Sequence, residues 1–160
     1  MGDREILDGI QEYFCIEEFV DKQTFDRHGN RAWKFIDPRL LETLLIIRRE
    51  LATGITINTW KWSGRFSERG LRTNVSNIVH KKTIEDKLYL SAHCMGKAVD
   101  FDVRGMGAQE VREWIQDHED ILPYKIRLEH KINKTGKPIT WVHLDVYYEP
   151  GNRKVYLFNV

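Results

Sequence analysis

The stretch Thr140-Trp141-Val142-His143-Leu144-Asp145-Val146-Tyr147 alternates strictly along its length. The two faces of a strand here would be Val142, Leu144 and Val146 on one side and Trp141, His143, Asp145 and Tyr147 on the other. A sheet that packs one face on a core and keeps the other for function has this pattern. The stretch therefore predicts a strand with His143 on the functional face.

A second stretch, Ser91-Ala92-His93-Cys94-Met95-Gly96-Lys97-Ala98-Val99-Asp100, carries two more possible metal ligands. Gly96 lets the chain fold back, so His93 and Asp100 can converge on one ion. Imidazole nitrogens and carboxylate oxygens are both good zinc ligands. We therefore expect one Zn²⁺ ion held by His93, Asp100 and His143.

Three protein ligands leave a fourth position for water, as a catalytic zinc site requires. We assign the general base to Glu129, at the end of a predicted strand. In an antiparallel hairpin about Thr135, Glu129 falls opposite the Trp141–Val142 level, one or two residues from His143. The sequence thus predicts a carboxylate within reach of the water.

Two neighbours of the ligands have other expected roles. Asp145, two residues beyond His143 on the same face, is the expected hydrogen-bond partner that orients the His143 ring. Cys94 follows His93, and its thiolate as a fourth ligand would close the site. We expect Cys94 to point away, because adjacent residues of an extended segment face opposite sides.

The rest of the chain predicts helices early and strands late. An amphipathic stretch covers about residues 6–20, a polar segment with a turn follows at 21–30, and Asp37-Pro38 opens a helix that ends near Gly54. A helix is also expected at about 108–119. Strands are expected at 55–60, 98–103, 124–132, 139–147 and 155–158, with a long irregular segment at 61–90. This order predicts one α+β domain over residues 1–160, with a largely antiparallel sheet.

Composition excludes several classes of partner. The chain has 160 residues, a formal net charge of +1, 41% hydrophobic and 31% charged residues, and two cysteines. Without a block of Lys and Arg, we expect no nucleic-acid binding. Without a long apolar run or an amino-terminal apolar segment, we expect no membrane insertion and no signal peptide. We therefore expect a cytoplasmic monomer with free thiols.

The motif Ser-x-His-x-x-Gly-x-Ala-x-Asp at Ser91–Asp100, with His143 on a later strand, resembles a known family. It is similar to the zinc D-Ala-D-Ala carboxypeptidases and the phage L-alanyl-D-glutamate endolysins, whose fold the hedgehog amino-terminal domain shares. The resemblance covers about residues 55–147. It implies a hedgehog-like fold with helices packed on one face of the sheet. It also implies the same three zinc ligands, with Ser91 as an outer partner.

The resemblance further implies a peptidase acting on peptidoglycan stem peptides, at a D-Ala-D-Ala or an L-Ala/D-Glu bond. Family members carry a Glu shortly before the last His; Thr140 stands there in this chain, so the role passes to Glu129. Among Arg65, Arg69 and Arg72 we favour Arg72 and Arg69 as holders of a substrate carboxylate. A phage origin, with release at lysis or in the virion, fits the lack of an export signal.

Two other functions stay open at this point. The first is a non-enzymatic, zinc-stabilised binding module, which Thr140 favours because no acidic residue stands there. The second is a virion-associated protein with a vestigial site.

Overall fold

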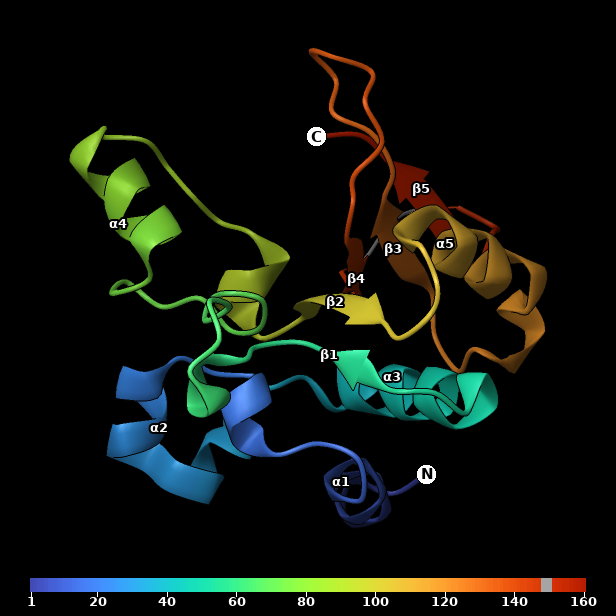
Figure 1. Ribbon diagram of the computed structural model, residues 1–160, viewed down its shortest axis with the longest axis horizontal. Coiled ribbons are helices and arrows are strands. Elements are labelled where there is room, and N and C mark those ends of the chain that lie inside the picture. The colour runs from blue at the N-terminus through green and yellow to red at the C-terminus, as the bar shows by residue number, and fades with distance from the viewer. Residues whose placement is uncertain (148–150) are drawn as a thin grey trace.

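The computed structural model describes residues 1–147 and 151–160, which form an α+β fold with five helices and a mixed five-stranded sheet (Figure 1). The helices are α1 (Asp3–Gln11), α2 (Lys22–His28), α3 (Pro38–Leu51), α4 (Asn77–Ile84) and α5 (Ala108–Asp117). The strands are β1 (Ile55–Thr56), β2 (Ala98–Val103), β3 (Ile126–Glu129), β4 (Val142–Asp145) and β5 (Val155–Phe158). Short 3₁₀ turns connect them: η1 (Ile16–Glu18), η2 (Gly29–Phe35), η3 (Trp60–Trp62), η4 (Ala92–Met95) and η5 (Glu119–Ile121).

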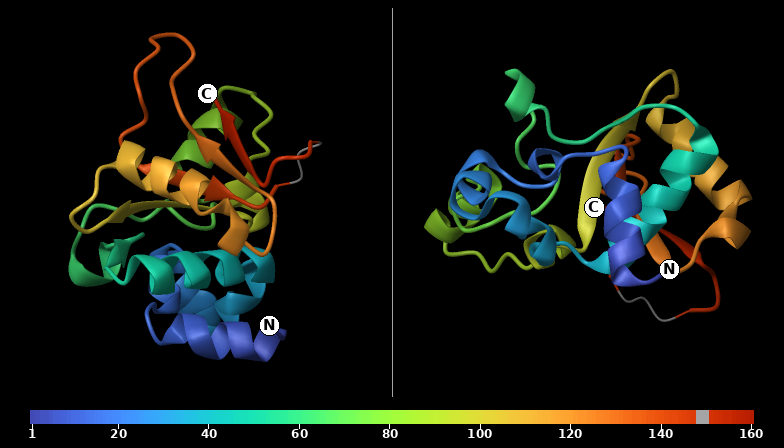
Figure 2. Two further views of the ribbon diagram at one scale, coloured as in Figure 1. Left: turned by 90° about the vertical axis from the view of Figure 1, so that its right-hand side faces the viewer. Right: turned by 90° about the horizontal axis from the view of Figure 1, so that it is seen from below.

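Helix α3 begins as its sequence predicts. The Asp37 carboxylate accepts the Arg39 N–H at 3.0 Å, and Pro38 occupies the first turn. The helix ends earlier than expected, because Ala52 takes the left-handed cap conformation with φ of 52° in place of Gly54. Helix α1 packs against α3 (Figure 2). The amphipathic stretch at residues 6–20 is therefore a helix followed by the separate turn η1.

The sheet is mixed, with strand order β1-β2-β4-β3-β5. The pairs β1–β2, β2–β4 and β3–β4 are antiparallel, whereas β3–β5 is parallel. The expected antiparallel arrangement thus holds for all pairs except the last. Because β2 and β3 already occupy both edges of β4, β5 adds to the outer edge of β3 instead of pairing with the strand it follows.

The two faces of the sheet differ as the alternation predicts. Val99, Phe101, Val142 and Leu144 are fully buried, and they share one core cluster with side chains from α1, α3 and α5. Asp100 and His143 belong to the alternate positions of the same strands. Helix α5 packs on β2 and β4. The expected packing of helices on the sheet does not extend to α4, because none of its residues is buried and it stands apart from the strands (Figure 1).

Candidate metal centre

The sheet register brings two of the expected ligands together. Asp100 of β2 pairs directly with His143 of β4 in the antiparallel register. Directly opposite residues of such a pair have their Cβ atoms about 4.5–5.5 Å apart. The pairing of the two strands alone therefore sets Asp100 and His143 side by side.

The turn η4 supplies the third side chain. Gly96 ends this turn with φ of 65°, a left-handed conformation that glycine adopts without strain. His93, inside the turn, has Nδ1 2.7 Å from the Gly70 carbonyl oxygen. Because a carbonyl oxygen can only accept, Nδ1 donates this bond and Nε2 is left for the site.

The three candidate ligand atoms converge on one point. His93 Nε2 lies 3.2 Å from His143 Nδ1 and 3.2 Å from Asp100 Oδ1, and His143 Nδ1 lies 2.8 Å from Asp100 Oδ1. A tetrahedral zinc ion with bonds of about 2.0–2.1 Å holds its ligand atoms about 3.3 Å apart. All three residues are buried, so this group could bind a metal ion.

Outer hydrogen bonds orient the ligands. His143 Nε2 lies 2.9 Å from Asp145 Oδ2, and Asp145 is fully buried. Arg127 holds the same carboxylate through Nε at 2.8 Å and Nη2 at 3.0 Å. Arg72 donates to Asp100 Oδ2 at 2.9 Å. Such partners fix the tautomer of a ligating histidine, and Asp145 stands where the sequence predicts it.

The pKa values of the two histidines in the site shift in opposite directions. Burial lowers the pKa of His93. Burial also opposes the charge on His143, but hydrogen bonds to Asp100 and Asp145 outweigh it and raise the pKa of His143 to about 9. Burial disfavours the Asp100 carboxylate, yet its hydrogen bond with His143 and its close contact with His93 hold the pKa of Asp100 well below its usual range. Below about pH 9, metal binding here therefore competes with the proton on His143.

Glu129 lies at the edge of this group. The β3–β4 register pairs Leu128 with Leu144, so Glu129 falls at the level of His143 and not at the Trp141–Val142 level expected from the sequence. Its Oε1 is 3.9 Å from His143 Nδ1. Burial raises the pKa of Glu129. A carboxylate in this position can exchange protons with a molecule bound beside the three ligands.

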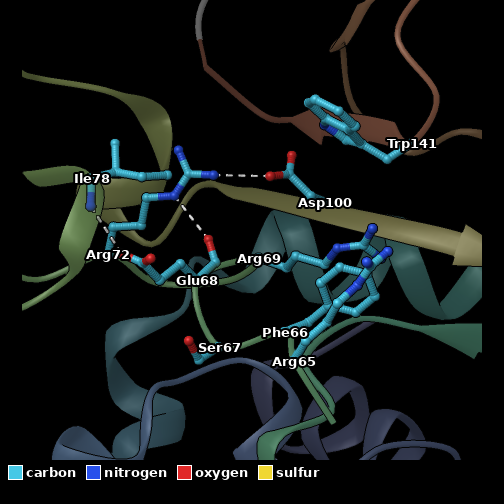
Figure 3. A pocket seen from close by; sticks show the side chains of 9 residues that line it. All are labelled: Arg65, Phe66, Ser67, Glu68, Arg69, Arg72, Ile78, Asp100 and Trp141. Atoms are coloured by element: carbon cyan, nitrogen blue, oxygen red, sulfur yellow. Dashed lines mark hydrogen bonds and ion pairs between the residues drawn. The ribbon is translucent and has the colours of Figure 1, made fainter.

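Two cavities meet at the group. One of about 490 Å³ is lined by His93, His143 and Glu129, together with Tyr89 and Tyr147. The other, of about 270 Å³, is lined by Asp100 and Trp141 (Figure 3). Arg72 lines both cavities. His93 and His143 therefore face the larger cavity, and Asp100 faces the smaller one.

The candidate arginines differ in their surroundings. Arg72 donates to the Glu68 carbonyl, the Tyr89 hydroxyl and Asp100, and Figure 3 shows its guanidinium group pointing at the Asp100 carboxylate. Arg69 is ion-paired with Asp102 at 2.6 Å. Arg72 thus contacts one of the three candidate ligands. Arg69 instead contacts Asp102, two residues further along β2.

Ser91 and Cys94 do not take part in the same way. The Ser91 hydroxyl lies 3.5 Å from Cys94 Sγ, so its close polar neighbour is the thiol and not a ligand as expected. Cys94 lines a separate cavity with Phe35 and Met95. The thiol points away because η4 is a tight turn, not the extended segment from which we predicted the same outcome.

The sequence did not predict two contacts of the site, those of Arg127 with Asp145 and of Gly70 with His93. Arg127 shares the strand alternation of Glu129, which could have indicated its approach to Asp145. The Gly70 carbonyl that orients His93 lies 23 residues away along the chain, and no sequence signal marks it.

Comparison of the chain with protein-family models, with curated proteins and with solved structures found no match. Within the described residues, no helix combines the length and apolar character that a membrane crossing requires.

Proposed function

We propose that this protein is a zinc-dependent peptidase that hydrolyses peptidoglycan stem peptides. The convergence of His93, Asp100 and His143 beside the Glu129 carboxylate, at the wall of an open cavity, carries the proposal. Two imidazoles and one carboxylate are a donor set suited to catalytic zinc. The likeness of the Ser91–Asp100 motif to cell-wall peptidases supplies the substrate class.

Each residue near the group has a task in this reaction. A zinc ion held by His93, Asp100 and His143 would supply a Lewis acid for the scissile carbonyl and would lower the pKa of a water molecule at the site to about 7. Glu129 takes the proton of the attacking water and returns it to the leaving amine. Asp145 and Arg127 hold the His143 ring. Arg72 is available to a substrate carboxylate, because it faces both cavities.

Digestion of purified peptidoglycan tests the proposal. Zinc-loaded wild-type protein should release new amino groups, and mass spectrometry of the fragments should identify the cleaved bond. Glu129→Gln should lower the rate by about 10²–10⁴-fold while retaining zinc, because it removes the proton acceptor and none of the three ligands. Glu119→Gln, the same change at an exposed position, should leave the rate unchanged.

Other outcomes separate the alternatives. Full zinc occupancy with no amine release from wild type would favour a zinc-stabilised binding module. Elemental analysis that finds no metal in protein purified without chelator, together with inactivity, would favour a vestigial site.

A further inference from the structure

The cavity of about 270 Å³ has a wall of paired cations on an aromatic ring. The guanidinium carbons of Arg69 and Arg65 lie 3.5 Å and 4.8 Å from the centre of the Phe66 ring. Figure 3 shows both guanidinium groups at this ring, on the Trp141 side of the cavity. Stacking uses the flat face of a guanidinium group and leaves its N–H edge available.

The three arginines of this cavity are not equally neutralised. Arg72 is paired with Asp100, and Arg69 is paired with Asp102. Arg65, in contrast, forms no ion pair with any residue that the structure describes. Glu68 also lines this cavity, but it lies at the Arg72 end, where its carboxylate accepts the Ile78 N–H. At the Phe66 end the charges are those of Arg65, Arg69 and the Asp102 carboxylate that pairs with Arg69, so a net positive charge remains there that an anion can compensate.

Trp141, which also lines this cavity, carries a further hydrogen-bond donor. Trp141 Nε1 is buried, and within the described chain it has no hydrogen-bond partner. A buried N–H without an acceptor costs free energy, so an oxygen atom entering beside Trp141 would be stabilised. Carboxylate oxygens match both this donor and the N–H edges of the two arginines.

We propose that Arg65 and Arg69, with Phe66 and Trp141, form an anion-binding subsite separate from Arg72. The substrate is then an acidic peptide with two carboxylates. One would bind at Arg72, and the other would bind at Arg65 and Arg69 in the cavity of about 270 Å³. This inference rests on the proposed peptidase function, because it narrows the substrate class of the same site.

Binding to a hydrolytically impaired protein tests the subsite. The probe is the synthetic peptide L-Ala-γ-D-Glu-L-Lys-D-Ala-D-Ala, which has two free carboxylates, and its two mono-amides. Titration calorimetry on zinc-loaded Glu129→Gln protein gives the dissociation constants. One mono-amide should bind about tenfold more weakly than the diacid, the lower range for a charge-assisted hydrogen bond.

The pairing of that carboxylate with Arg65 is tested by a double change. Arg65→Gln should weaken the diacid about tenfold and should not further weaken the sensitive mono-amide, since both changes remove the same contact. Arg4→Gln is the matched control, because Arg4 is an exposed arginine of α1. It should change neither constant. Additive losses, equal losses for all peptides, or no binding by any of them would overturn the subsite.

The two proposals fail separately. A protein that cleaves peptidoglycan without distinguishing the mono-amides would refute the subsite and leave the peptidase standing. A protein that binds the diacid through Arg65 and cleaves nothing would refute the peptidase and retain the subsite.

Discussion

Asp145 shows how one buried side chain can set the properties of a neighbouring ligand. It is fully buried and contacts His143 Nε2, Arg127 and the Tyr147 N–H. Hydrogen bonds from His143 and Arg127 outweigh burial and lower the pKa of Asp145. The resulting carboxylate fixes a proton on Nε2, so Nδ1 of His143 faces Asp100 and His93.

Replacing Asp145 by Asn should therefore weaken zinc binding without removing a ligand. The amide keeps the size of the side chain but loses the negative charge that orients and polarises His143. We expect the zinc dissociation constant to rise about 10–100-fold, the usual effect of removing such a partner. Competition with a fluorescent chelator measures it.

Asp102→Asn gives the matched control on β2, because Asp102 is partly exposed and pairs with Arg69. It should leave the zinc dissociation constant unchanged. If Asp145→Asn also binds zinc as tightly as wild type, the orienting role of Asp145 is wrong.

At the residue scale the sequence predicted the meeting of His93, Asp100 and His143, because motif spacing and strand alternation are local signals. The contacts of Arg65 and Arg69 with Phe66 depend on how residues 61–72 fold over β2. No periodicity encodes that path, so their difference from Arg72 could not be predicted.

The turn η4 is constrained by Gly96, the residue that ends it. Gly96 combines φ of 65° with close packing against η2: a Cβ atom there would lie 1.9 Å from the Phe35 carbonyl oxygen. The Gly96 carbonyl also accepts the Asp37 N–H at 2.9 Å. The turn that carries His93 is thus fixed to the start of α3.

Gly96→Ala should destabilise the fold and displace His93. Backbone strain of this kind costs about 1–3 kcal/mol, and the clash with Phe35 adds to it. We expect a melting temperature lower by at least about 3–10 °C. Zinc affinity should fall as well, because the turn must move. Calorimetry and zinc titration measure the two effects.

Gly54→Ala is the control for this prediction. A Cβ atom at Gly54 would meet the Arg104 side chain at an ordinary 3.7 Å, so little change is expected. Equal melting temperatures for Gly96→Ala and wild type would show that the turn can relax at no cost.

Element boundaries were predictable where strong local signals exist. Strands β2 and β5 have the expected bounds, and α3 follows its Asp37-Pro38 start. Helices α2 and α4 were missed, because each is short and α4 buries no residue, so neither has an apolar period. The cap at Ala52 was missed because a non-glycine residue occupies a position that favours glycine.

The order of the strands in the sheet is determined by the packing of the whole molecule and not by any single segment. Alternation predicts that a segment is a strand but says nothing about which edge it joins. The parallel partnership of β5 with β3 depends on β4 being flanked on both sides. The α+β class was therefore predictable, while the mixed character of the sheet was not.

The stability of the whole molecule should respond to pH in opposite ways with and without zinc. In metal-free protein the pKa of His143 is raised from its ordinary 6.5 to about 9. Its stabilising contribution is complete below pH 6.5 and is lost as the pH rises toward 9. Zinc needs the neutral imidazole, so the stabilisation by zinc should grow over the same window.

Melting temperatures between pH 6.5 and 9 measure both trends, with chelator or with stoichiometric zinc. The loss in metal-free protein should be on the order of 1–3 kcal/mol. Glu42 also raises the pKa of the Met1 amine, so the comparison that isolates His143 is with His143→Gln. That variant should lose the His143 part of the slope and the zinc effect together. A metal-free melting temperature that rises with pH, or a zinc effect independent of pH, would contradict the proton–metal exchange at His143.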